Sequence, residues 1–139
     1  MTTTTAETPA PGKALHIGLW VAQVLLALAF GAAGAMKAFT PAAELATKMA
    51  WVNHVPAGLI PFIGLSEVAG ALGLILPALT RIKPVLTPVA AALLVVVMVL
   101  AGALHVSIGE PPIPNVILGA LAGFVAWGRF KRAPIAPRS

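Results

Sequence analysis

Four side chains with useful chemistry interrupt an otherwise apolar chain. They are Lys37 in GAMKAF, Glu67 in GLSEVAGALGLILP, His105 in VVVMVLAGALHV and Asn115 just after GEPPIP. Glu67 could accept a proton or face a ligand, and His105 could tune that carboxyl or donate to a ligand carbonyl. Lys37 would add positive charge. The set is suited to hold the polar group of a small ligand or to pass a proton.

Other chemistries find little support in the residue pattern. The chain has no cysteine, HExxH motif or Gly-rich nucleotide loop, so we expect no metal site. Ser66 and Ser107 lack a base and an orienting acid where a catalytic triad would need them. His16 and His105 are predicted at opposite membrane faces. His54 and His105 share one side, which leaves axial haem ligation open as an alternative.

Composition places these residues in a membrane protein. Hydrophobic residues make up 59% of the 139 residues and charged residues 9%, with a mean hydropathy of +0.97. A soluble domain has about 25% charged residues. Four apolar runs, at about 14–36, 57–79, 84–108 and 113–128, are each near the ~20 residues that a spanning helix needs. We therefore predict an all-α bundle of four transmembrane helices within residues 14–130, even though the third run is rich in valine.

Basic residues predict the orientation of the bundle. Seven fall on one predicted side: Lys13, Arg81, Lys83, Arg129, Lys131, Arg132 and Arg138. The other side has Lys37 and Lys48, opposed by Glu44 and Glu110. Positive residues favour the cytoplasm, so we expect a multi-pass protein of the cell (inner) membrane with both termini on the cytoplasmic side. Because the basic residues do not cluster on a soluble face, nucleic acid is not an expected partner. A cleaved signal peptide ending at residues 33–35 is the alternative reading of the first run.

The segments outside the four runs are also predicted. Thr40 and Pro41 resemble a helix start, and Leu45, Met49 and Val52 follow at helical spacing. We expect a short amphipathic helix on the outer membrane surface, or else a solvated loop. Residues 1–13 and the basic residues 131–139 are expected to be disordered tails.

Small residues accompany the polar ones along each predicted helix. We expect them to pack helices closely; they are Gly64, Gly70, Gly73, Gly119 and Gly123. Glu67 would lie roughly 15 Å from the outer end of its helix at 1.5 Å per residue. We predict an outer-leaflet cavity with Glu67 at its floor and Lys37, His105 and Asn115 around its mouth. Gln23 would face a different neighbour in the inner half.

Each of these residues also has a purely structural interpretation. Lys37 could extend to the membrane surface, His105 could be an ordinary interfacial residue, and Asn115 could cap its helix. Glu67 could be a protonated carboxyl that joins two helices.

Three stretches resemble the DoxX-like family of small four-helix membrane proteins. They are GAMKAF, IGLSEVAGALGLILPALTRIKP and VVVMVLAGALHV, and the similarity extends from about Leu15 to Phe130. The positions that the resemblance carries over are Lys37, Glu67, Pro77, Arg81, His105 and Asn115. It implies links to quinone-linked oxidation, to redox-stress membrane complexes and to membrane-protein assembly. A quinone is a candidate cofactor on this ground alone.

Three functional hypotheses follow. The first is an accessory or ligand-binding subunit, for example of a quinone-linked oxidoreductase, with no catalysis expected from this chain alone. The second is a proton-coupled transporter, although the helices show no inverted repeat. The third is a structural assembly factor that uses Gly119 and Gly123 to bind another helix. The bilayer, another membrane protein or a second copy of the chain are the expected partners.

Overall fold

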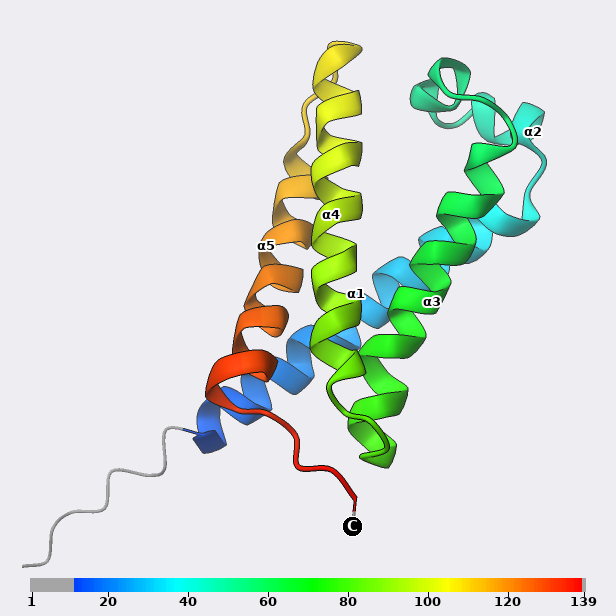
Figure 1. Cartoon of the computed structure of the whole chain (residues 1–139). Helices are drawn as coiled ribbons and strands as arrows, with labels where there is room; N and C mark the ends of the chain where they lie inside the picture. Colours follow the sequence, from blue (N-terminus) through cyan, green and yellow to red (C-terminus); the bar gives the residue numbers. More distant parts are fainter. Residues whose placement is uncertain (1–11, 139) are drawn as a thin grey trace, which may run out of the picture.

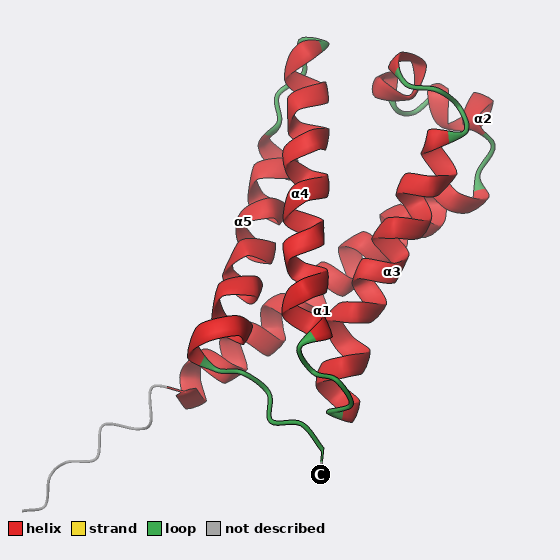
Figure 2. Ribbon diagram, in the orientation of Figure 1, coloured by secondary structure: helices red, strands yellow, loops and turns green. Residues whose placement is uncertain are grey.

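Four long helices form the protein in a computed structural model that describes residues 12–138. The long helices are α1 (Gly12–Phe39), α3 (Leu59–Thr80), α4 (Leu86–Ser107) and α5 (Ile113–Trp127). Two short segments, α2 (Ala42–Ala46) and the 3₁₀ turn η1 (Ala50–His54), connect α1 to α3, and a π-helical turn, η2 (Gly128–Arg132), continues α5. Figure 2 shows that these described residues contain no strand.

The outer surface of the helices is apolar. Each long helix, with η2 included in the last, is long and hydrophobic enough to cross a membrane. Large side chains such as Leu28, Leu93 and Val116 are more than half exposed on this surface. Apolar surface of this extent is suited to lipid, in which a helix satisfies its own backbone hydrogen bonds. The predicted all-α, multi-pass membrane bundle is confirmed.

The helices lie close together at one end of the bundle and separate toward the other (Figure 1). The close end carries the start of α1, the connection between α3 and α4, and the end of α5; we call it the termini end. The opposite end carries α2, η1 and the loop between α4 and α5; we call it the α2 end. Toward the α2 end, α1 and α3 stay paired and so do α4 and α5, while α3 diverges from α4.

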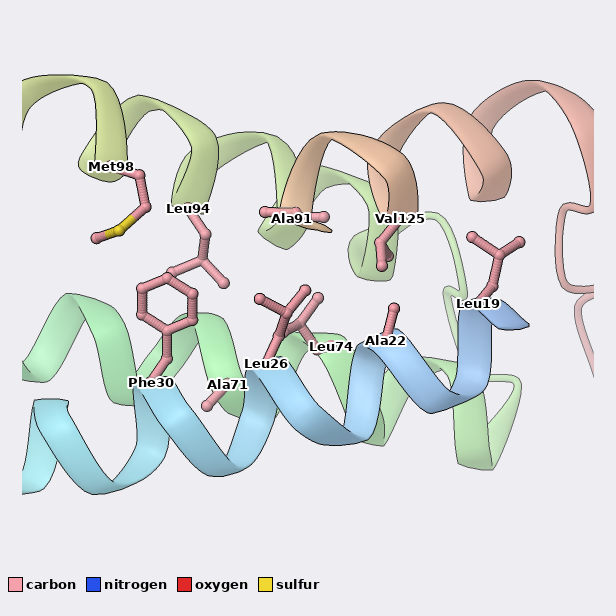
Figure 3. Packing of buried hydrophobic residues seen from close by; sticks show 11 residues of the cluster. Leu19, Ala22, Leu26, Phe30, Ala71, Leu74, Ala91, Leu94, Met98 and Val125 are labelled. Carbon is pink, nitrogen blue, oxygen red and sulfur yellow. The ribbon is translucent and has the colours of Figure 1, made fainter. Parts of the chain in front are cut away.

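The main hydrophobic core begins at the termini end and reaches mid-bundle. Leu19, Ala22, Leu26 and Phe30 recur every three or four residues on α1, which puts them on one face of the helix. Figure 3 shows that face meeting the other long helices. The facing buried residues are Ala71, Leu74, Ala91, Leu94, Met98, Ala122 and Val125.

Glycines set the closest helix contact, between α1 and α3. A Cβ atom on Gly34 would lie 2.6 Å from the carbonyl oxygen of Gly64, and one on Gly64 would lie 2.5 Å from the backbone nitrogen of Ala38. Since both obstacles are backbone atoms, neither can move aside as a side chain would. Only glycine at Gly34 and Gly64 allows this separation between the two helices.

The other glycines assigned to packing receive side chains from α4. A Cβ on Gly70 would lie 2.7 Å from Leu94 and one on Gly73 would lie 2.7 Å from Ala90. On α5, Gly119 has Met98 at 3.3 Å, whereas Gly123 has only ordinary contact with Val95 at 4.0 Å. Gly119 and Gly123 therefore face α4 of the same chain.

Pro77 lies inside α3 and leaves a backbone carbonyl without its usual donor. Proline has no N–H, so the carbonyl oxygen of Gly73, four residues earlier, receives no helical hydrogen bond from it. The Thr87 hydroxyl of α4 donates to that oxygen at 2.9 Å, and Thr87 is fully buried. A neighbouring helix thus compensates for the proline, as membrane helices often require.

The connection between α1 and α3 folds back onto the bundle. Leu45, Trp51, Val52 and Ile60 form a second buried cluster at the α2 end. The expected short helix is present, but it has only five residues and a turn separates it from η1. Thr40 does not cap it, because Pro41 holds the N-cap position and no side chain bonds there.

Part of the predicted C-terminal tail forms regular structure. Residues 1–11 and 139 lie outside the described residues. Lys131 and Arg132 belong to η2, and the backbone N–H of Arg138 donates to the carbonyl oxygen of Arg81 at 2.8 Å. The described C-terminal residues therefore lie across the termini end of the bundle (Figure 1).

The α1–α3 contact predicts the effect of one added methyl group. We expect Gly64→Ala to lower stability by about 2 kcal/mol, because the new Cβ must push two backbones apart. Gly18→Ala is the matched control, since nothing lies within 4 Å of a Cβ there, and alanine favours a helix. Thermal unfolding in detergent would measure both variants. Equal melting temperatures for the two variants would contradict this account of the contact.

Candidate functional site

A cavity of about 440 Å³ opens between α3 and α4 near the α2 end. Its volume falls within the range of small-molecule sites. The walls are mostly apolar and come from the two diverging helices: Leu59, Phe62, Ile63, Val97, Leu100, Ala101 and Leu104. All four predicted polar residues line it as well: Lys37 from α1, Glu67 from α3, His105 from α4 and Asn115 from α5.

An ion pair joins two of these residues across the α1–α3 contact. Lys37 Nζ donates to Glu67 Oε1 at 2.6 Å, and the side chains are 14% and 2% exposed. Lys37 lies three residues after Gly34, and Glu67 three residues after Gly64. The glycine contact therefore brings the two helices close enough, one turn away, for the side chains to meet. Lys37 was expected at the cavity mouth, but its Nζ reaches the floor.

Trp51 covers the lysine from the connecting segment. Lys37 Nζ lies 5.7 Å from the centroid of the Trp51 ring, within the distance at which a cation is attracted to an aromatic face. Trp51 is a buried member of the second cluster and lines the cavity. Lys37 thus has a carboxylate and an aromatic face in an apolar setting, where their attraction is stronger than in water.

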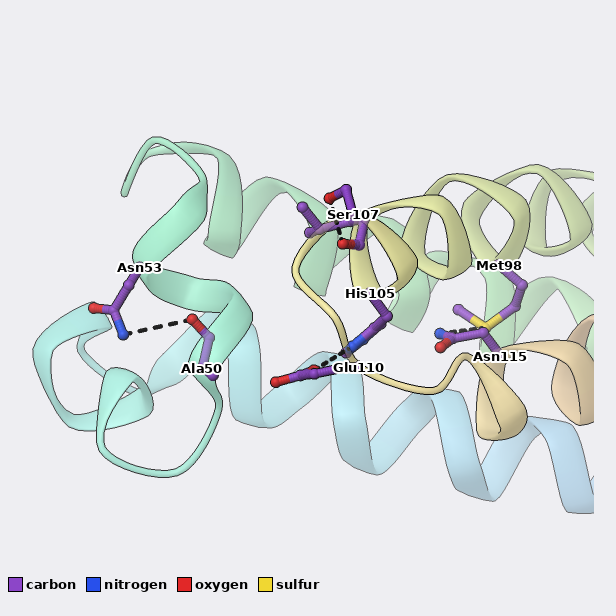
Figure 4. A network of polar contacts seen from close by, with 8 residues as sticks. Ala50, Asn53, Met98, His105, Ser107, Glu110 and Asn115 are labelled. Carbon is purple, nitrogen blue, oxygen red and sulfur yellow. Dashed lines mark hydrogen bonds and ion pairs between the residues drawn. The ribbon is translucent and has the colours of Figure 1, made fainter.

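His105 pairs with a residue that the sequence did not assign to the site. Its Nδ1 lies 2.6 Å from Glu110 Oε2, and the backbone N–H of Glu110 donates to the carbonyl oxygen of His105 at 2.8 Å. Figure 4 shows Glu110 turning back from the loop after α4 toward the ring. Glu67 was the expected partner of His105, but Glu67 bonds to Lys37. The imidazole is therefore held at the cavity mouth by Glu110.

Asn115 does not cap its helix, which was the structural interpretation of this residue. Pro112 occupies the N-cap position of α5 without any side-chain bond, and Asn115 lies in the first turn of the helix. Its amide nitrogen lies 3.7 Å from the sulfur of Met98, which is a weak acceptor (Figure 4). Asn115 thus bridges α5 to α4 at the cavity wall and does not cap its helix.

Several lining residues were missed at the sequence level. Val97, Ala101 and Leu104 precede His105 at helical spacing, so the face of α4 that carries the histidine could have identified them. Trp51 gave no such signal, because only the folding of the connection places it over Lys37. The described residues contain no group of three potential metal ligands, and His54 is not among the lining residues.

Gln23 lies at a second polar site, toward the termini end. Its amide donates to the carbonyl oxygen of Leu74 at 2.7 Å, and its oxygen accepts from Arg129 Nε at 2.7 Å. His16 lies beside the same arginine, so it is far from His105. Gln23 therefore bonds to residues outside the cavity, as its predicted position in the inner half suggested.

Comparison with protein families identifies the family of the chain. The model described as the DoxX-like family matches residues 21–128. The chain belongs to the DoxX-like family. The matched region covers most of the four long helices and every residue of the cavity. Among the curated proteins and the solved structures, none matches this chain. Family membership agrees with a multi-pass membrane bundle and does not by itself give an activity.

The Lys37–Glu67 pair predicts an asymmetric effect of substitution. We expect Lys37→Met to lower stability by about 3 kcal/mol, because Glu67 is left buried without its partner. Lys37→Met/Glu67→Leu should recover most of this loss, since an apolar pair can replace a buried ion pair. Unfolding of the detergent-solubilised protein would measure both. Lys48→Met removes an exposed lysine and serves as the control; a loss as large in this control would contradict the prediction.

Proposed function

We propose that this DoxX-like protein binds a small amphipathic molecule of the membrane and acts as the ligand-holding subunit of a larger membrane assembly. The observation that carries the proposal is the cavity itself. An apolar chamber of about 440 Å³ ends in a buried Lys37–Glu67 pair. Ligand sites commonly combine apolar walls with a few fixed polar groups.

The apolar walls indicate the route of entry. Phe62 and Leu100 line the cavity and are also 65% and 66% exposed on the outer surface of the bundle. In a bilayer this surface faces lipid, so the opening between α3 and α4 is lateral. A hydrophobic tail or ring could then pass from the membrane into the chamber without crossing water.

The polar end indicates the kind of headgroup. Lys37 has further donor capacity beyond its bond to Glu67, and Asn115 has both a donor and an acceptor. His105 presents an imidazole at the mouth. A carbonyl or hydroxyl on a compact ring would find complementary groups here. Quinones have this chemistry, and the family resemblance is the reason to test them first. With the predicted orientation, the site lies in the outer leaflet.

Two features favour binding over the other hypotheses. Between the cavity and the termini end, Leu26, Leu74 and Leu94 fill the described core, each at most 1% exposed, and none of the three lines the cavity. This filled core favours a closed binding chamber over a passage for a solute. Gly119 packs against Met98 of the same chain, so this face of α5 is already used internally. A partner protein would therefore contact another surface.

Filling the chamber should displace the ligand. We expect Ala101→Phe to reduce co-purified quinone or lipid about tenfold, the change produced by ~1.4 kcal/mol of lost binding energy. Mass spectrometry of organic extracts, normalised to protein, would measure it. Leu93→Phe adds the same ring to α4 at an exposed position outside the cavity and is the matched control.

Quinone binding can also be followed directly. Trp51 is the tryptophan that lines the cavity, and Trp20→Phe/Trp127→Phe leaves it as the sole fluorophore. In nanodiscs, an added quinone should quench Trp51 in this background and lose that effect when Ala101→Phe is included. Equal quenching with Ala101→Phe and with Leu93→Phe would rule out the cavity as the quinone site. If the cavity retained another amphipathic molecule instead, the proposed binding site would stand, but its ligand would not be a quinone.

A further inference from the structure

The termini end contains a buried arginine that the cavity does not involve. Arg129 lies in η2 and is 2% exposed. Its Nε donates to Gln23 Oε1 at 2.7 Å, while Nη1 donates to the carbonyl oxygen of Ala133 at 3.0 Å and lies 2.9 Å from His16 Nδ1. Among the described residues, its Nη2 is buried and has no hydrogen-bond partner. One face of the guanidinium fork is therefore unused.

Local structure brings this arginine into the bundle. A Cβ on Gly128 would lie 2.5 Å from the side chain of Leu19, so glycine lets the start of η2 approach α1 closely. Gly128 begins the π-helical turn η2, and the next residue, Arg129, contacts Gln23 and Trp20. The guanidinium carbon lies 5.8 Å from the Trp20 ring. π-helical turns are found frequently at functional sites.

The charge of Arg129 has no counter-ion among the described residues. Their acids are Glu44, Glu67 and Glu110. Glu67 and Glu110 pair with Lys37 and His105, and Glu44 lies on α2, so all three are toward the α2 end. The termini end instead carries further basic residues: Lys13, Arg81, Lys83, Lys131, Arg132 and Arg138. A buried charge without a partner is costly, and this one lies in a strongly positive region.

We propose that Arg129 anchors a phosphate-binding site at the termini end, filled by the headgroup phosphate of an anionic phospholipid or by free phosphate. The guanidinium binds phosphate oxygens through charged hydrogen bonds, and Nη2 is the donor left for them. His16 is exposed and Trp20 is half-buried, so the guanidinium lies directly beneath the surface. The proposed phosphate would bind Nη2, because Gln23 already occupies Nε and the Ala133 carbonyl already occupies Nη1.

The predicted orientation favours a phospholipid, rather than free phosphate, as the source of the bound phosphate. Positive residues place the termini end at the cytoplasmic leaflet, where anionic lipids concentrate. The site is separated from the cavity by the main core, so neither proposal depends on the other.

Nanodiscs of defined composition would test the site. In wild-type protein we expect phosphatidylglycerol, mixed into phosphatidylcholine, to raise the melting temperature by about 5 °C through binding to the folded state. Arg129→Gln should abolish the rise, and Arg129→Lys should retain part of it, because lysine keeps the charge and loses the fork. Lys131→Gln removes an exposed charge from the same turn and should keep the full rise.

One further experiment distinguishes the two candidate ligands, the anionic lipid and free phosphate. Inorganic phosphate added to pure phosphatidylcholine nanodiscs should stabilise the wild type but not Arg129→Gln if the free anion is the ligand. The proposal is overturned if Arg129→Gln keeps the wild-type rise, or if Lys131→Gln loses as much. It is also overturned if neither phosphate source stabilises the wild type. Glu7, the remaining acidic side chain of the sequence, would in that case be tested as the counter-ion by Glu7→Gln.

A second measurement does not require the variants to fold. Phosphatidylglycerol with a photoreactive headgroup should crosslink the wild-type protein at residues 16–20 or 133–138, around Arg129. A phosphatidylcholine probe with the same label should not. Crosslinks confined to the exposed Lys131 and Arg132, or equal labelling by both probes, would overturn the proposal.

Discussion

The close approach of α1 and α3 is the constraint on which the rest of the structure depends. Gly34 and Gly64 place backbone against backbone, and no other pair of residue types would allow it. One turn further along, the same proximity lets Lys37 reach Glu67 over 2.6 Å. In lipid there is little hydrophobic force between helices, so close packing and polar contacts hold them together. This contact supplies both, and it fixes the position of the charged floor of the cavity.

The cavity follows from how the second helix pair is attached. At the termini end, Thr87 of α4 bonds to the carbonyl that Pro77 leaves free in α3, and Gly73 admits Ala90. These contacts hold α3 and α4 together where the connection is short. Toward the α2 end the two helices separate (Figure 1), and Trp51 of η1 lines the cavity beside Lys37. A bundle that is tight at one end and open at the other thus has room for a ligand beside its buried charge.

Polar groups in this bundle are divided between two levels along its length. One level contains Lys37, Glu67 and the His105–Glu110 pair. The other contains Arg129, bonded to Gln23 and next to His16. Apolar core lies between them, and no hydrogen bond among residues 12–138 joins the two levels. Charged groups are expensive within a membrane and tend to mark functional sites. Among the described residues, the first level contains paired charges, which is the basis of the proposed site for a neutral polar headgroup. In the second level the described residues offer Arg129 no counter-ion, which is the basis of the proposed anion site.

The sequence by itself determined the membrane class, the four helices, the family and the four polar residues that line one cavity. Apolar run length and small-residue faces are local properties, and a helix in lipid must satisfy its backbone within its own segment. Only the tertiary structure decided which polar residues are partners. His105 bonds to Glu110 because the loop after α4 turns back, Trp51 covers Lys37 because the connection folds inward, and Arg129 is buried because Gly128 lets η2 approach α1. These contacts depend on loop paths and on distances between helices, which helical periodicity does not encode.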